Sequence, residues 1–245
     1  MSDPIVVPST PATTGPEMST AETLTGIFFE PSRTFESLRA RPRFLVAGII
    51  LLVLSIIVTA ALFMRVDMGQ YIRERIERSP NAAQVPEAQK EMQVKLGKTV
   101  GMVLVPAITP IAIAAGAALY LLGVMAMGGA ISYKKALSVW TYSSIPPTVL
   151  GSLIVILVLF LKSADSIDPE HLVVTNPGVL FGEESSKVLV AALSQFDLLR
   201  FYGMFLAALG LRKVAKISSG QAWGIVIALW VILALLRIVM AVIRG

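Results

Sequence analysis

Long uninterrupted runs of apolar residues dominate the chain and alternate with shorter polar segments. The clearest run, residues 44–64, holds 21 residues without a charge, enough for an α-helix to cross the ~30 Å hydrocarbon core of a bilayer. Four further runs predict spans at residues 99–127, 145–161, 188–211 and 221–243. The pattern therefore predicts an all-α, polytopic membrane protein with about five transmembrane helices.

The segment before the first span divides into two parts. Residues 1–26 are rich in Pro, Ser and Thr and hold no Lys, Arg or apolar run, which predicts a disordered tail. They do not have the pattern of a cleavable signal peptide, because the first basic residue is Arg33 and the first long apolar run begins at Phe44.

Residues 27–43 predict a short amphipathic helix at the membrane interface. Phe28, Phe29, Phe35 and Leu38 supply an apolar side. Arg33, Arg39, Arg41 and Arg43 supply cations that can bind anionic lipid head groups. The alternative is a juxtamembrane linker whose arginines only fix the topology.

Composition removes several classes of chemistry. The chain has no cysteine, which excludes disulfides, thiolate metal sites and cysteine nucleophiles. His171 is the single histidine and lies in a polar loop, so we expect no metal site, no cofactor and no Ser-His relay. The net charge of +5 does not predict nucleic-acid binding, because the basic residues lie at the ends of apolar runs.

Three charged residues lie within predicted spans and are the candidate functional residues. Asp197 and Arg200 fall in the fourth span and Arg237 in the fifth. In an antiparallel pairing of these spans, Asp197 and Arg237 differ in depth by about one helical turn, so an ion pair is feasible. Arg200, at i+3, is an alternative partner of Asp197.

Two interpretations of these charges stay open. They could line a substrate or proton pathway, or they could be a structural pair that holds two helices together while Arg237 extends toward the interface. The structural interpretation is favoured, because a transporter would be expected to carry titratable groups on several spans. In the first three spans only Tyr120 qualifies.

Small residues predict where helices approach closely. The second span is rich in alanine around Gly116, and the fourth contains Gly203 and Ala207. Small side chains let neighbouring helices pack at short distance in a bilayer, so we expect these three residues at helix contacts. A homo-oligomer would be compatible with this pattern.

The distribution of Lys and Arg predicts the orientation. With the N-terminus in the cytoplasm, the inner segments hold nine basic residues and the outer segments ten. Seven of those ten lie in residues 65–98, where five acidic residues alternate with them. We therefore expect a cytoplasmic N-terminus.

Four segments, in their order and spacing, resemble the Yip family of five-pass membrane proteins and especially its bacterial branch. They are FFEPSRTFESLRARPRF, ISYKKALSVWTYSSIPPTVLGSLI, VVTNPG and LSQFDLLRFYGMFLAALGLRKVAKISSGQAW, and the resemblance covers about residues 27–240. It implies a five-helix membrane domain, residues 44–245 here, with a cytoplasmic N-terminus. Rab binding is not implied, because the Pro/Thr-rich tail differs from the acidic, aromatic segment of the eukaryotic members.

The functional expectation is a non-enzymatic membrane scaffold or adaptor in the bacterial cytoplasmic membrane. Its partners would be the lipid bilayer and membrane or cytoplasmic proteins that the sequence does not identify. The alternative is a small permease or channel subunit that uses Asp197, Arg200 and Arg237.

Overall fold

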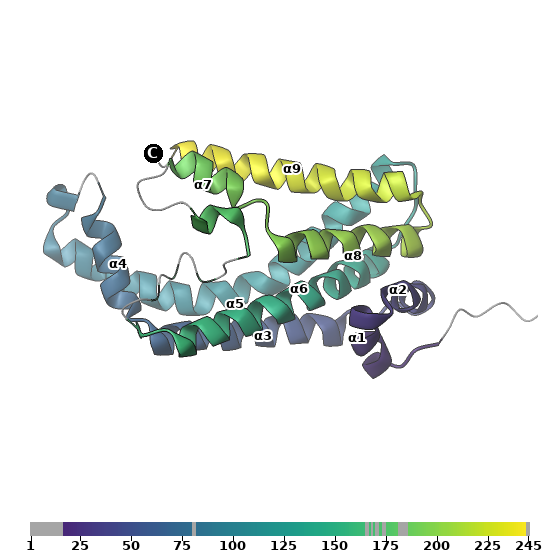
Figure 1. Ribbon diagram of the computed structural model, residues 1–245, viewed down its shortest axis with the longest axis horizontal. Helices are drawn as coiled ribbons and strands as arrows, with labels where there is room; N and C mark the ends of the chain where they lie inside the picture. Colours follow the sequence, from purple (N-terminus) through teal and green to yellow (C-terminus); the bar gives the residue numbers. More distant parts are fainter. Residues whose placement is uncertain are drawn as a thin grey trace, which may run out of the picture.

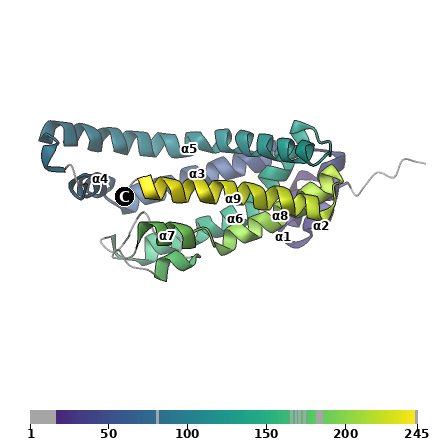
Figure 2. The same cartoon turned by 90° about the horizontal axis from the view of Figure 1, so that it is seen from above.

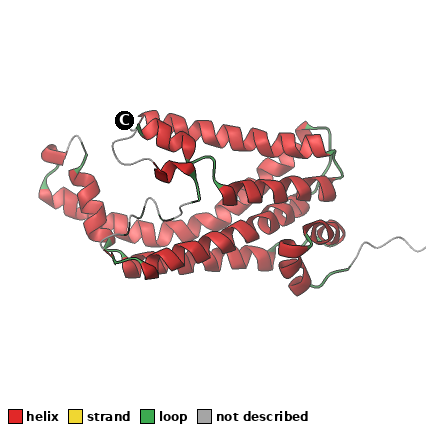
Figure 3. Ribbon diagram, viewed as in Figure 1, coloured by secondary structure: helices red, strands yellow, loops and turns green. Residues whose placement is uncertain are grey.

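The computed structural model describes residues 17–79, 82–164, 167, 169, 172, 175–180 and 186–243. In this part of the chain every regular element is a helix (Figures 1 and 3). Four long helices carry most of the apolar sequence: α3 (Leu45–Arg65), α5 (Glu87–Ala126), α6 (Tyr133–Leu161) and α9 (Ser219–Ile243). Two shorter ones, α7 (Lys187–Leu193) and α8 (Leu198–Ala215), follow one another along the fourth apolar run.

Five segments are long and apolar enough to cross a bilayer, as the hydrophobic pattern predicted. They are Leu45–Arg65, Glu87–Ala126, Tyr133–Leu161, Val188–Ala215 and Ser219–Val242. Large apolar side chains cover much of their outer surface, for example Ile56 and Leu157, which are 47% and 57% exposed. Such a surface is stable in lipid and not in water, so the protein is an all-α, multi-pass membrane protein.

The third span begins twelve residues earlier than predicted. Ser132 caps α6 by accepting a hydrogen bond from the backbone N–H of Lys135, and the helix then runs to Leu161. Pro146 and Pro147, expected in its first turn, lie inside the helix. Proline has no backbone N–H, so two hydrogen bonds of the helix are lost there. A membrane helix tolerates this loss when it packs on neighbouring helices, as α6 does on α3, α5 and α8.

The fourth span is not continuous. Helix α7 ends at Leu193, and α8 starts at Leu198 after a short break that contains Gln195 and Asp197. Asp197 is the N-cap of α8, and its backbone is extended. The hydrophobic pattern did not predict this break: three of its four residues, Ser194, Gln195 and Asp197, are polar, but apolar residues flank it on both sides.

The disordered tail predicted for residues 1–26 ends too late in the chain. Helix α1 (Thr20–Phe29) begins inside that range, and residues 1–16 lie outside the described part. Ser19 and Glu22 form a capping box, in which each side chain binds the backbone N–H of the other residue. Helix α2 (Pro31–Ala40) follows after Glu30, so α1 and α2 form one helical hairpin, which we call the N-terminal hairpin.

The two ends of the bundle differ (Figure 1). The N-terminal hairpin lies at the end where α3 begins and where α8 connects to α9. At the opposite end, α4 (Met68–Glu77), η1 (Ala82–Gln84) and the first turns of α5 form a polar arm. At 40 residues, α5 is about 60 Å long, so it extends well beyond a ~30 Å hydrocarbon core. Figure 2 shows it running the length of the molecule.

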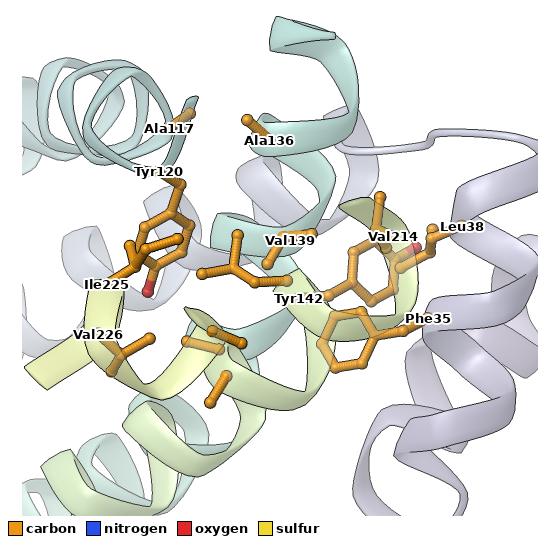
Figure 4. Packing of buried hydrophobic residues seen from close by; sticks show 14 of the residues in the cluster. Phe35, Leu38, Ala117, Tyr120, Ala136, Val139, Tyr142, Val214, Ile225 and Val226 are labelled. Atoms are coloured by element: carbon orange, nitrogen blue, oxygen red, sulfur yellow. The ribbon is translucent and has the colours of Figure 1, made fainter. Parts of the chain in front are cut away.

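The main hydrophobic core lies toward the hairpin end. It joins residues of α1, α2, α3, α5, α6, α8 and α9, with Phe35, Leu38, Val139 and Tyr142 fully buried in it (Figure 4). A smaller core around Leu159 lies toward the arm end, where η3 (Pro177–Leu180) and α7 are also found. The hairpin is therefore part of the same folded unit as the membrane helices.

Candidate functional site: the N-terminal hairpin and the arginine cavity

Apolar residues of the N-terminal hairpin pack into the bundle. Ile27, Phe35 and Leu38 have no exposed surface, and α2 packs mainly on α8. The predicted apolar side of this interfacial segment is thus divided: Phe35 and Leu38 face protein, whereas Phe29 remains 85% exposed. An interfacial helix buries its apolar side in lipid and not against other helices. This hairpin is therefore docked on protein.

Two polar contacts hold the hairpin in place. The Thr23 hydroxyl of α1 lies 3.0 Å from the Tyr142 hydroxyl of α6, and both residues are buried. Glu36 of α2 accepts a hydrogen bond of 2.5 Å from Lys213 in the last turn of α8. These contacts join segments far apart in sequence and fix the rotation of the hairpin on the bundle.

The four predicted head-group arginines have different surroundings. Arg33 pairs with Glu30 at 3.0 Å, and Arg41 pairs with Glu17 at 2.8 Å. Arg43 donates to the Thr20 hydroxyl, which ties the chain after α2 to the start of α1. Among the described residues, Arg39 has no hydrogen-bond or ion-pair partner. Head-group binding stays a prediction for all four; in the described part of the chain, Arg39 and Arg43 are the two that have no acidic partner.

Asp197 caps a helix and does not form the expected ion pair. Its carboxylate accepts hydrogen bonds from the backbone N–H of Arg200 at 2.9 Å and from the Thr175 hydroxyl. No ion pair joins it to Arg200 or Arg237 in the described part of the chain. The idea of an Asp197–Arg237 pair is therefore wrong, because the break in the span gives Asp197 four free N–H groups of α8 to cap.

Arg200 and Arg237 instead line one cavity. It has a volume of about 590 Å³ and lies between α5, α6, α8 and α9. The Arg200 side chain donates to the Gln195 side-chain oxygen at 2.6 Å, while Arg237 has no polar partner among the described residues. Near the break in the span, the indole N–H of Trp230 in α9 donates to the Gln195 carbonyl, with a nitrogen-to-oxygen distance of 3.4 Å.

The two serine hydroxyl groups in this cavity donate to the backbone. Ser143 and Ser144 both donate to the Trp140 carbonyl, at 3.1 and 2.8 Å. A nucleophilic serine needs a base as its hydrogen-bond acceptor, and a backbone carbonyl cannot take up its proton. The part of the chain that the structure describes also contains no group of three His, Asp or Glu side chains placed to hold a metal ion; His171 lies outside that part.

The three small residues predicted at helix contacts are found in tightly packed positions. A β-carbon added at Gly116 of α5 would lie 2.2 Å from the Trp140 ring of α6. One added at Gly203 of α8 would lie 3.3 Å from Pro147 of α6, and Ala207 is 1% exposed within the main core. Trp140 also contacts Tyr120, at a ring-centroid distance of 4.8 Å. Because of these contacts, α5 and α8 pack directly on α6.

Sequence reasoning missed two functional features of the hairpin and the cavity. The docking of the hairpin was missed, although Ser19-Thr20-Ala21-Glu22 has the spacing of a capping box and could have indicated a helix at this point. The cavity itself has no local sequence signal, since its lining comes from four helices.

Comparison with known proteins identifies the family. The model of the Yip1 domain family matches residues 25–240. The membrane protein YknW of Bacillus subtilis (strain 168) is 28% identical over 204 residues, which cover 82% of this chain and 81% of YknW. No solved structure matches. The match begins within α1 and continues almost to the end of α9, so it includes most of the hairpin and reaches into all five spans. The chain belongs to the Yip1 domain family of membrane proteins.

Proposed function

We propose that the protein is a non-enzymatic scaffold or adaptor of the bacterial cytoplasmic membrane, which recruits partners through the outer surface of its N-terminal hairpin. The observation that carries this proposal is the docking of the hairpin. Phe35 and Leu38 are fully buried against the bundle, while Phe29, Arg33 and Arg41 are exposed. A surface held in one orientation loses little conformational entropy when a partner binds.

The exposed side of the hairpin has the composition of a protein-binding surface. Phe29 is an aromatic residue with 85% of its surface free, and aromatic residues with arginine are enriched at binding hot spots. Arg33 and Arg39 lie on the same short hairpin. The mixture suits a partner with an apolar pocket beside acidic groups.

A cytoplasmic position of the hairpin is supported by charge. The hairpin end carries four arginines between residues 33 and 43, two lysines at the start of α6 and three cations at the α8–α9 connection. Ion pairs occur at both ends: Arg33, Arg41 and Lys213 pair with acidic residues at the hairpin end, and Lys90 and Arg73 lie 2.7 and 3.6 Å from Glu87 in the polar arm. Lys and Arg in short segments beside a span favour the cytoplasmic side, and the nine cations at the hairpin end all lie in such segments.

The permease alternative would use the cavity lined by Arg200 and Arg237. It predicts ion conductance in planar bilayers that changes when Arg237 is neutralised. The scaffold hypothesis predicts that the purified protein conducts no ions and that neutralising Arg237 does not change the measured conductance.

Site-specific photocrosslinking in native membranes tests the proposal. A photoreactive phenylalanine analogue would replace Phe29 on the hairpin or, as a matched lipid-facing control, Leu157 of α6, which is 57% exposed. The scaffold predicts discrete protein adducts from position 29 that disappear when Phe35→Asp undocks the hairpin, and lipid adducts only from position 157. Lipid adducts alone at both positions would contradict it.

A further inference from the structure

The arginine cavity is amphipathic along its length. Arg200 of α8 and Arg237 of α9 line one end, while Tyr120, Trp140 and Val226 line the other. On α9, Val226 and Arg237 are eleven residues apart, which corresponds to about 16 Å along the helix. Two cations at one end and an apolar, aromatic depth at the other match the order of groups in a phospholipid.

The charged end lies near one surface of the bilayer. Arg237 is six residues from the last residue of α9, Ile243, or about 9 Å along the helix axis. Arg200, in the first turn of α8, lines the same cavity and so lies close to the level of Arg237. Both guanidinium groups are therefore placed near the boundary between head groups and acyl chains, in the leaflet that the C-terminal end of α9 meets.

The charges at this end are incompletely balanced. Arg237 has no ion pair among the described residues, and the side-chain partner of Arg200 is the neutral Gln195. Asp197 is the nearest acid in sequence, but its oxygens accept hydrogen bonds from Thr175 and from the backbone of Arg200. Two cations within the membrane that share at most one carboxylate are energetically costly unless a further anion binds beside them.

We propose that this cavity binds one anionic phospholipid, with its phosphate between Arg200 and Arg237 and one acyl chain along the apolar depth toward Tyr120 and Trp140. A guanidinium binds a phosphate through paired, charge-assisted hydrogen bonds. The volume of about 590 Å³ falls within the ~300–1,000 Å³ typical of small-molecule sites.

The same features select the class of lipid. A zwitterionic head group would bring its own ammonium close to two guanidinium groups, whereas a head group such as glycerol adds no positive charge. Free inorganic phosphate would satisfy the arginines but leave the apolar depth empty, so it gains nothing from hydrophobic burial.

Competition between lipids tests this proposal on the purified full-length protein. Native mass spectrometry would count bound phosphatidylglycerol and phosphatidylcholine of matched chain length, offered together in neutral detergent. The variants are Arg200→Gln and Arg237→Gln, with Arg212→Gln as the control, because Arg212 is an exposed cation at the opposite end of α8.

Tryptophan fluorescence provides a second readout at the site itself. Trp140 and Trp230 line the cavity and Trp223 does not, so Trp223→Phe leaves only reporters in the cavity. Phosphatidylglycerol with brominated acyl chains should quench them. Leu233→Trp, read by mass spectrometry, fills the cavity one turn from Arg237 while it keeps both cations.

We expect phosphatidylglycerol to bind at least about tenfold more tightly than phosphatidylcholine, and each of the two cavity arginine variants to lose about tenfold. Leu233→Trp should also weaken binding, Arg212→Gln should not, and millimolar phosphate should not displace the lipid. Equal binding of the two lipids, cavity variants that match Arg212→Gln, or displacement by phosphate would each overturn the proposal. If an arginine variant does not fold, Leu233→Trp and the wild-type lipid preference still decide the question.

Discussion

The ring of Phe35 in α2 lies against the backbone of α8 at Gly210, where a β-carbon would be only 2.8 Å from the ring. The two residues are 175 positions apart in the chain, and Phe35 is fully buried. This contact requires both a large apolar side chain on the hairpin and the absence of one on α8. It makes the orientation of the hairpin depend on a membrane helix.

Gly210→Ala should therefore weaken the docking of the hairpin. The added methyl group clashes with Phe35 and Val139, so we expect a loss of about 1–3 kcal/mol in thermal or denaturant unfolding in detergent. Gly48→Ala is the control, because its added carbon meets only Ile113 at 4.0 Å. Combining Gly210→Ala with Phe35→Leu should cost less than the sum of the two single changes. If the two glycine substitutions changed the free energy of unfolding equally, the close contact between Gly210 and Phe35 would not contribute to stability and the prediction would fail.

The role of Asp197 as a helix cap predicts a difference between two neutral substitutions. Asparagine also caps helices, so Asp197→Asn should leave stability nearly unchanged, whereas Asp197→Ala should cost about 0.5–2 kcal/mol. The measurement is the unfolding midpoint of each purified variant. A buried ion pair with Arg237 would instead make the two substitutions equally damaging.

Arg65, at the C-terminal end of α3, joins α3 to the C-terminal end of α6. Its guanidinium donates to the Leu159 carbonyl at 2.8 Å and to the Lys162 carbonyl at 3.1 Å, where α6 ends, and its charge suits the negative end of that helix. We expect Arg65→Gln to destabilise the protein by about 1–3 kcal/mol and Arg65→Lys by less. Arg39→Gln serves as the control in the same unfolding assay. No difference between Arg65→Gln and Arg39→Gln would show that these bonds contribute nothing.

The capping box of α1 predicts a response to acid. Hydrogen bonds from the backbone and the hydroxyl of Ser19 hold the pKa of the exposed Glu22 carboxyl below its usual value of 4.5. Because the pKa is lower in the folded state, the stabilisation is present above 4.5 and is lost as the pH falls through the lowered value. Hydrogen exchange of the α1 amides should therefore accelerate in that window, and Glu22→Gln should remove this response. An identical acceleration in Glu22→Gln would exclude the capping box as its cause.

The five spans could be predicted because length and hydrophobicity alone decide whether a helix crosses a bilayer. The break at residues 194–197 was missed, because its polar residues lie between two apolar runs and its contact between Trp230 and the Gln195 carbonyl joins residues 35 positions apart. The start of α6 was placed too late because Pro146 and Pro147 are typical of a first helical turn. The candidate residues Arg200 and Arg237 do share a site, but as two cations beside one cavity and not as ion-pair partners of Asp197.

Cysteine accessibility tests most directly whether the hairpin is docked on the bundle and lies on the cytoplasmic side of the membrane. The natural chain has no cysteine, so single cysteines at Phe29, Leu38, Gln84 and Ser218 can be labelled in cells with a membrane-impermeant maleimide. We predict that position 84 reacts in intact cells, that positions 29 and 218 react only after permeabilisation, and that position 38 reacts only after denaturation. Labelling of position 38 as fast as position 29 in the native protein, or of positions 29 and 84 from the same side, would contradict the account.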